Sequence, residues 1–309
     1  MEKVSFIIPC YRSESTISGV IKDIINTVKE SEYDYEIICV DDSSPDGVFF
    51  VLKELCKTNH KIKAIRFAKN FGQHAGMIAG IHYVTGDYIV FLDDDGQCPI
   101  VHLQEMLKPL TEEWDVSIAR YNKKKQSLFK NCGSWVHETA ANLLIDKPKT
   151  IQMSNFIAMK KYIAEEIARY EGPYPHISGL LFRSSKKIKN VPMEENERVA
   201  GESTYSVRKL VALWVNSFTA FSVKPLRFAA ILGFLFATTG FIYGVFLVIR
   251  KLIDSTIAAG WSSLMVLLLI IGGMILLVLG MMGEYVGRIY MSINNTPQYV
   301  IAEKYNFDD

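Results

Sequence analysis

The chain has 309 residues, a formal net charge of +1 and 49% hydrophobic residues. This length suits one large domain or two smaller units, and a charge so close to zero gives no general attraction for nucleic acid. The five cysteines occur singly, without a Cys-x-x-Cys pair, which argues against a disulfide framework or a zinc site and fits a reducing cytosol. Residues 1–225 have the composition of a soluble α/β protein, whereas 226–290 contain two long apolar runs.

The first hundred residues alternate between strand and helix patterns. Apolar, β-branched segments at 4–9, 35–40, 62–67 and 87–92 predict strands, and helical spacing of apolar residues between them predicts crossover helices. This alternation predicts an α/β domain with a mostly parallel sheet. No Gly-x-Gly-x-x-Gly follows the first strand and no Walker loop occurs, which disfavours ordinary dinucleotide and P-loop sites.

Acidic residues follow two of these strands directly. Asp41 and Asp42 end the second strand, and Asp93, Asp94 and Asp95 end the fourth. Open α/β sheets bind ligands at the carboxyl ends of their strands. Three adjacent carboxylates repel one another, so a divalent cation that in turn holds a diphosphate is one compensation, and an exposed acidic turn is the alternative.

Five motifs occur in the order found in family 2 glycosyltransferases with a GT-A nucleotide-sugar domain, and the chain resembles that family. Each motif is weak alone, but five in the same order make a strong signal. Within the family the whole chain looks like the polyprenyl-phosphate branch, which includes dolichyl-phosphate mannose synthase and bacterial undecaprenyl-phosphate sugar transferases. The motifs are Pro9-x-Tyr11, Asp41-Asp42-Ser43, Asn70-Phe71-Gly72-Gln73-His74-Ala75-Gly76, Gly86-Asp87-Tyr88 and Asp93-x-Asp95-Gly96-Gln97.

The resemblance implies a role for each matching residue. It places Pro9, Tyr11, Asp41 and Asp42 around the base and ribose of a UDP-sugar, makes His74 a pocket residue, and has Asp93, Asp95 and Gln97 bind Mg²⁺ or Mn²⁺ with the diphosphate. Asp94 is an additional acid in the donor site. This chain departs from the family pattern at two places. The family's Pro-x-Tyr-Asn-Glu is altered after Tyr11, so its acidic contact is either lost or shifted to Glu14. Cys98 replaces an acid beside the metal site.

Residues 100–160 continue the α/β pattern. A helix is predicted over 101–110 and a strand over 115–119, followed by Arg120, which matches a family arginine near the donor phosphates. The lysines at 123–125 are a solvated loop or, alternatively, a mobile lid. A strand is predicted over 151–159, and within it Asn155 stands where relatives carry an acid proposed as the catalytic base. Asn cannot take a proton, but a polyprenyl phosphate is already a dianion near neutral pH, so we expect Asn155 to orient groups.

The segment 198–205 resembles the family's Arg-x-x-Gly-Glu-Ser-Lys-Tyr. Arg198 and Ser203 are expected to donate to the acceptor phosphate, with Asp95, Asn155 and Arg198 as the catalytic set, while Thr204 replaces the usual lysine. An amphipathic helix on a membrane surface is predicted over 205–226, with a packed core helix as the alternative.

Two runs without a charged residue, 228–249 and 261–282, follow. As helices each would be roughly 33 Å long, enough to cross a hydrocarbon core of about 30 Å. We therefore expect a transmembrane hairpin. The C-terminal segment has strand character at 298–301, and in relatives this segment adds to a neighbouring protomer. The expected divisions are 1–204 (cytosolic catalytic domain), 205–226 (juxtamembrane helix), 227–250 and 261–282 (transmembrane helices), 251–260 (extracytoplasmic loop) and 283–309 (juxtamembrane helix and strand).

Taken together, the residues and the resemblance predict a metal-dependent, inverting transfer of one sugar from a UDP-sugar to undecaprenyl phosphate. The enzyme would lie in the bacterial inner membrane with its catalytic domain in the cytosol, and the resemblance implies a homo-oligomer, a tetramer. Alternatives are a GDP-mannose-dependent mannose synthase and a non-catalytic membrane scaffold, which would explain Asn155, Cys98 and Ser13. A processive polysaccharide synthase is disfavoured because no Gln-x-x-Arg-Trp motif occurs.

Overall fold

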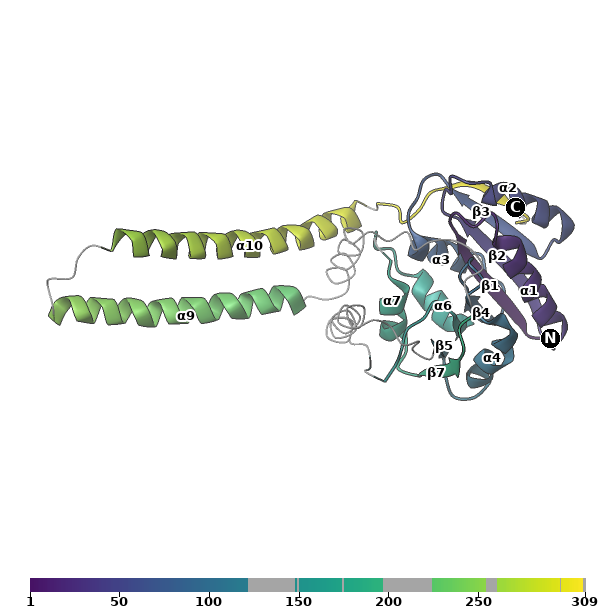
Figure 1. The fold of residues 1–309 in the computed structure, drawn as a ribbon, viewed down its shortest axis with the longest axis horizontal. Coiled ribbons are helices and arrows are strands. Elements are labelled where there is room, and N and C mark those ends of the chain that lie inside the picture. Colours follow the sequence, from purple (N-terminus) through teal and green to yellow (C-terminus); the bar gives the residue numbers. More distant parts are fainter. Residues whose placement is uncertain are drawn as a thin grey trace. The chain divides into compact units, whose positions relative to one another are not determined.

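The computed structural model describes residues 1–121, 148, 150–173, 175–196, 224–253, 260–294 and 296–307 of the chain. The chain divides into two compact units, Met1–Leu210 with Asn295–Asp309, and Val211–Asn294. The first unit contains a sheet with helices on its faces, and the second contains a pair of long helices (Figure 1).

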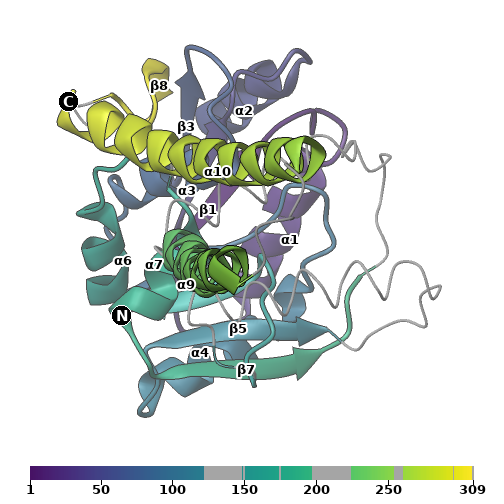
Figure 2. The same ribbon diagram turned by 90° about the vertical axis from the view of Figure 1, so that its left-hand side faces the viewer.

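Among the described residues, eight strands form one mixed sheet in the order β7-β5-β6-β4-β1-β2-β3-β8. Strands β1 to β4 are parallel, as are β5 and β7, whereas β6 is antiparallel to β4 and β5, and β8 is antiparallel to β3. Figure 2 shows β7 and β8 as the two outermost strands, at opposite ends of this order. The strands are β1 (Lys3–Cys10), β2 (Asp34–Asp41), β3 (Ile62–Phe67), β4 (Tyr88–Phe91), β5 (Val116–Tyr121), β6 (Ile157–Lys160), β7 (Ile188–Met193) and β8 (Ile301–Tyr305).

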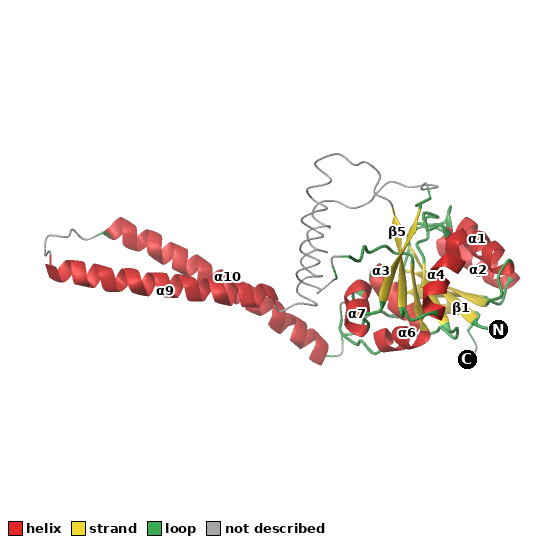
Figure 3. Ribbon diagram, turned by 90° about the horizontal axis from the view of Figure 1, so that it is seen from below, coloured by secondary structure: helices red, strands yellow, loops and turns green. Residues whose placement is uncertain are grey.

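Helices cover both faces of the sheet. Figure 3 shows α1, α2 and α4 on one side of the strands and α3, α6 and α7 on the other. The apolar spacing predicted for the first helix is confirmed, because Ile17, Ile21, Ile24 and Val28 are buried against the sheet. The helices of this unit are α1 (Ile17–Lys29), α2 (Val48–Thr58), α3 (Gln73–Ile81), the 3₁₀ turn η1 (Ile100–His102), α4 (Leu103–Thr111), α6 (Lys161–Ala168) and α7 (Ile177–Ser184).

The α/β fold class and the first five strands are therefore confirmed, with small differences at strand ends. The strand predicted over 151–159 is shorter, since only Ile157–Lys160 joins the sheet. Before it, the side chain of Asn190 replaces a strand partner: its Oδ1 accepts from the Gln152 N–H at 2.7 Å and its Nδ2 donates to the Gln152 carbonyl at 2.8 Å. Backbone groups of this segment are thus satisfied without a ladder.

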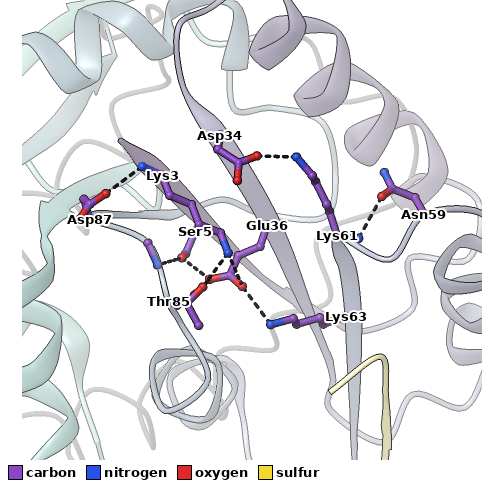
Figure 4. Close-up of polar contacts among 10 residues, drawn as sticks. Lys3, Ser5, Asp34, Glu36, Asn59, Lys61, Lys63, Thr85 and Asp87 are labelled. Carbon is purple, nitrogen blue, oxygen red and sulfur yellow. Dashed lines mark hydrogen bonds and ion pairs between the residues drawn. The ribbon is translucent and has the colours of Figure 1, made fainter. Parts of the chain in front are cut away.

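A buried ionic network lies at the amino-terminal edge of the sheet (Figure 4). The carboxylate of Glu36, in β2, accepts hydrogen bonds from Ser5 Oγ and from the Thr85 N–H, each at 2.6 Å. Its other oxygen lies 3.0 Å from Lys63 Nζ and 3.4 Å from Lys3 Nζ. Burial alone would raise the pKa of Glu36, but these donors and Lys63 outweigh it and lower the pKa to about 2.

The C-terminal segment returns to this sheet. The strand expected at 298–301 is found at Ile301–Tyr305, where β8 pairs with β3 of the same chain. Gln298 lies before the strand, and its amide donates to the carbonyl of Gly172 at 2.8 Å. The ring of Tyr299 stacks on Phe67 with centroids 5.2 Å apart. These polar and aromatic anchors fix the segment before the strand begins.

The second unit contains α9 (Lys224–Ile253) and α10 (Trp261–Ile293), which lie side by side (Figure 1). Both are long and apolar enough to cross a membrane by length and composition, over Ala229–Phe246 and Ile270–Ile293. Helix α10 continues through residue 282, where a boundary with a separate juxtamembrane helix was expected. Most of the amphipathic helix predicted over 205–226 lies outside the described residues.

Candidate active site

The sheet topology brings the acidic residues together. Strands β1, β2 and β4 are parallel, so Tyr11, Asp42 and Asp93 follow strand ends at the same edge. Strand β6 is antiparallel to β4, with Ile157 opposite Phe91. Extending that register by two residues places Asn155 across from Asp93, at the same edge.

Asp93 is held by two neutral amides. Its carboxylate accepts from Gln73 Nε2 at 2.8 Å and from Asn155 Nδ2 at 3.1 and 2.9 Å. Burial raises the pKa of Asp93 to about 6, with Asp95 and Asp94 adding to the rise and the two amides opposing it. The amides orient the carboxylate but carry no charge, so they leave the negative charge of the site uncompensated.

The neighbouring carboxylates have different partners. Asp94 accepts from the Tyr11 backbone N–H at 2.9 Å, and burial raises its pKa. It therefore connects the loop after β1 to the loop after β4. Asp95 Oδ1 accepts from the Gln97 backbone N–H at 3.1 Å, which closes the tight turn that contains Gly96, with a φ of 78°.

These residues suit a metal ion that binds together with a diphosphate. Across the described ranges there is no group of three or more His, Cys, Asp or Glu side chains that could hold a metal by itself. Mg²⁺ and similar ions are commonly bound through one or two carboxylates, with substrate phosphates and water completing the coordination. Asp93 and Asp95 can supply such oxygens, and the buried, uncompensated charge on Asp93 favours a cation there.

Asp41 and Asp42 lie beside this acidic loop. Asp42 accepts from the backbone N–H groups of Phe71 at 2.6 Å and Gly72 at 2.8 Å, while burial raises its pKa to about 6. Asp41 is fully buried, and its Oδ1 accepts from the Ser44 N–H at 2.8 Å. Pro9 is buried in β1 beneath them. The two carboxylates can accept hydrogen bonds from hydroxyl or N–H groups of a nucleoside.

The predicted contact of Glu14 has a structural role. Its Oε2 accepts from the Gly47 N–H at 2.8 Å, and its own N–H donates to Asp46 Oδ2 at 3.0 Å. A Cβ at Gly47 would lie 2.7 Å from Glu14 Oε1, so only glycine allows this approach. Glu14 thus holds the loop after β1 against the loop after β2. Tyr11, in the same loop, remains 44% exposed.

Four predicted site residues remain: His74, Arg120, Arg198 and Ser203. His74 lies against His176, with ring centroids 4.7 Å apart, and burial together with that neighbour lowers the pKa of His74 to about 3. His74 is therefore neutral. Arg120 is exposed at the carboxyl end of β5, the same edge of the sheet. Arg198 and Ser203 lie outside the described residues.

The structure adds residues to which the sequence assigned no role. Gln73 stood within a quoted motif, and its position at the start of α3 could have suggested a contact with the strand ends. Asn196 was not singled out; its N–H donates to the Gln97 carbonyl at 3.1 Å. A cavity of about 340 Å³ adjoins this place and is lined by Asp93, Gly96 and Asn196 as well as by polar residues of α1.

Comparisons with known proteins match both units. Residues 5–168 match the family described as Glycosyl transferase family 2, and residues 224–289 match the GtrB C-terminal hairpin. Among curated relatives, the glycosyltransferase YkcC of Bacillus subtilis, described as uncharacterized, is 31% identical over 99% of this chain and 95% of its own length. The undecaprenyl-phosphate 4-deoxy-4-formamido-L-arabinose transferase of Photorhabdus laumondii is 31% identical over 98% and 94%.

Two more distant proteins complete the comparison. A bactoprenol glucosyl transferase of Shigella flexneri, derived from prophage SfII, is 28% identical over 98% of each chain. Among solved structures, glucosyl-3-phosphoglycerate synthase of Mycobacterium tuberculosis, in complex with Mn²⁺ and uridine-diphosphate-glucose, has a TM-score of 0.50 at 15% identity and covers 71% of this chain and 77% of its own. At that identity the likeness shows a shared fold.

Proposed function

The chain belongs to glycosyl transferase family 2, and from that premise we propose that it transfers one sugar from a UDP-sugar to undecaprenyl phosphate. Two relatives of similar length are transferases named for undecaprenyl phosphate or bactoprenol, which supports a polyprenyl-phosphate acceptor. The observation that carries the proposal is the grouping of Asp42, Asp93 and Asn155 at one sheet edge, where the hydrogen-bond donors to Asp42 and Asp93 in the described part of the chain are neutral.

Donor recognition is proposed for the loops after β1 and β2. An ionised Asp42 can accept the N–H of a pyrimidine base, and Asp41 a hydroxyl or N–H of the same nucleoside. Tyr11, held by Asp94, offers a ring face on which a base can stack. Guanine also presents N–H donors, so GDP-mannose is the alternative donor, and direct competition between nucleotides separates the two.

For the diphosphate we propose Asp93, Asp95 and Gln97 as the residues that hold Mg²⁺ or Mn²⁺. The bound ion would supply electrostatic stabilisation of the leaving nucleoside diphosphate. Arg120 is proposed for the same phosphates because its guanidinium is exposed at this edge of the sheet. The solved neighbour that contains Mn²⁺ and uridine-diphosphate-glucose agrees with this proposal.

Asn155 is proposed as an orienting residue. Its amide donates to both oxygens of Asp93, an interaction that a carboxylate at this position could not make when ionised. The acceptor phosphate is mostly a dianion at neutral pH and can attack the anomeric carbon directly, without a base. Inversion at that carbon is proposed from the family resemblance. Arg198 and Ser203 are proposed to bind that phosphate, on the basis of the family resemblance.

Membrane anchoring is proposed for α9 and α10. Residues 224–289 match a hairpin family, and both helices have the length and composition of membrane spans. A lipid-linked acceptor requires a site at the membrane surface, and nucleotide sugars are cytosolic, so we place the catalytic domain on the cytosolic side of the bacterial inner membrane. Assembly into a homo-oligomer, which the family resemblance implies to be a tetramer, is part of the same proposal.

A donor panel tests the function directly. Membranes that contain the chain are incubated with individual UDP-sugars, GDP-mannose and undecaprenyl phosphate, and the lipid products are identified by mass. We expect one UDP-sugar to give a lipid-linked monosaccharide in a metal-dependent reaction. Product from GDP-mannose alone would select the alternative donor, and no product with any donor, together with no metal-linked stabilisation by UDP, would favour a scaffold.

A further inference from the structure

A buried carboxylate of the donor site depends on a residue from outside it. Asp41 is fully buried at the end of β2, and its Oδ1 accepts a hydrogen bond from the Ser44 N–H. Its Oδ2 is buried and has no hydrogen-bond partner among the described residues. Burial raises the pKa of Asp41, and nearby Asp46 adds to the rise. Such a group needs a cation to remain ionised.

The cation beside Asp41 is Arg66. Its Nε lies 3.3 Å from Asp41 Oδ2, at ion-pair distance although without hydrogen-bond geometry. Arg66 stands directly opposite Asp41 in the β2–β3 pairing, and Glu303 stands opposite Arg66 in the β3–β8 pairing. Residues that face each other across neighbouring strands share one face of the sheet. Three charged residues therefore form a row across β2, β3 and β8.

The outer members of this row hold the guanidinium in place. Glu303 Oε1 lies 3.8 Å from Arg66 Nη1, and the other Glu303 oxygen accepts from Lys53 Nζ at 2.6 Å. The guanidinium carbon also lies 5.1 Å from the centre of the Phe49 ring, within the range of a cation–π contact. Arg66 is thus positioned between an acid of the donor site and an acid of the last strand.

We propose that Arg66 is a positioning residue for the donor site, and that Glu303 of β8 holds it so that Asp41 stays ionised and oriented toward the nucleoside. This inference rests on the proposed function, since it takes Asp41 as a ligand of the donor. It makes the last strand of the chain, which follows the long helices in sequence, a contributor to nucleotide affinity. Neither Arg66 nor Glu303 touches the donor itself.

The test compares UDP binding by full-length variants in detergent, measured by titration calorimetry with Mn²⁺ present, together with KM and kcat for the donor. Arg66→Met removes the cation, Arg66→Lys keeps the charge without the planar fork, and Glu303→Gln removes the outer anchor. Lys61→Met is the matched control, because Lys61 pairs with Asp34 and lies over the Tyr35 ring on the same two strands, at their far end.

We expect Arg66→Met to weaken UDP binding by about tenfold, Glu303→Gln by about threefold, and Arg66→Lys to recover part of the loss. The donor KM should rise in parallel while kcat at saturating donor changes less than twofold. Lys61→Met should bind UDP like the parent chain. If Arg66→Met fails to fold, the exposed and isosteric Glu303→Gln carries the test.

Two results would overturn the inference while leaving the proposed function intact. The first is a UDP affinity within about twofold of the parent in folded Glu303→Gln and Arg66→Met. The second is an equal loss of UDP affinity in Lys61→Met, which would indicate a general effect on the strands. Failure of the parent chain to bind UDP would overturn the proposed donor and this inference together.

Discussion

The two edges of the sheet treat buried carboxylates in opposite ways. At the amino-terminal edge Glu36 is neutralised by Lys63 and Lys3, and its pKa is lowered to about 2. At the carboxyl edge the donors to the buried Asp42 and the partly buried Asp93 are neutral among the described residues, and the pKa of each carboxyl is raised to about 6. A carboxylate with its cation already in place stabilises the fold. A carboxylate that lacks one has unused capacity for a ligand, and functional sites gather such groups.

The largest effect that we expect is a loss of activity on substitution at the carboxyl edge. We expect Asp95→Ala to reduce lipid-linked sugar formation by about 10²–10³-fold, because it removes a carboxylate that holds the metal and the diphosphate. The loss is measured as product formed by membranes containing equal amounts of protein. Thermal stability should be unchanged or slightly higher, since one of several repelling acids is gone. Near-normal turnover would rule out the metal assignment.

The matching substitution at the amino-terminal edge should lower stability and leave activity almost unchanged. Glu36→Gln removes the charge that pairs with Lys63 and Lys3, and we expect a loss of about 2–3 kcal/mol in the free energy of unfolding. Because the pKa of Glu36 is lowered in the folded state, its contribution is complete above about pH 4.5, the usual value, and is lost as the pH falls toward 2. Specific activity per folded protein should stay within about twofold of the parent.

Substitutions of Asn155 test how the charge and orientation of Asp93 at the carboxyl edge affect the reaction. Asn155→Ala removes two hydrogen bonds to Asp93 and should lower kcat by about tenfold. Asn155→Asp restores the acid of relatives and places another negative charge beside Asp93, so we expect it to lower the metal concentration required for half-maximal rate. Because an ionised carboxylate cannot donate to Asp93, kcat at saturating metal should fall as in Asn155→Ala. Metal titrations of both variants measure these effects. A parental kcat at saturating metal in Asn155→Asp would contradict the orienting role.

The smallest expected effect is on pH dependence. Since a protonated Asp42 is a weaker acceptor for an N–H than the carboxylate, affinity for UDP-glucose should fall by about fivefold between pH 7 and pH 5, around the pKa of about 6. UDP-glucose is preferred to UDP because it lacks the terminal phosphate ionisation near pH 6. Because the pKa of Asp42 is raised in the folded state, its contribution to the free energy of unfolding increases as the pH falls from 6 toward 3.8. Titration of Asp42 therefore does not unfold the protein, and a loss of affinity in this range reports on binding. Asp42→Asn should flatten the profile.

Much of the first domain could be predicted from the sequence because its signals are local. Runs of β-branched residues predicted the first strands, and the acids after β2 and β4 predicted an acidic edge. By contrast, β7 was not predicted, because Asn190 and Pro192 interrupt its pattern. The start of β6 was misplaced because a side chain, Asn190, takes the role of a strand partner.

The contacts within the site depended on long-range pairing that the sequence does not display. That Asn155 faces Asp93 follows from the antiparallel register of β6, and that Glu303 faces Arg66 follows from the pairing of β8. Glu14 was expected at the nucleotide, but the close approach permitted by Gly47 turns it toward a neighbouring loop. Residue types therefore predicted an acidic edge, and the strand register decided which residues meet there.

The central claim is that Asp93 and its neighbours hold a divalent ion together with a nucleoside diphosphate. The most direct measurement is the affinity of the full-length chain for UDP with Mn²⁺ and with a chelator, in the parent and in Asp93→Asn. The account predicts binding at least tenfold tighter with Mn²⁺ in the parent, and loss of that difference in the variant. Equal affinity with and without the metal in the parent chain would contradict it.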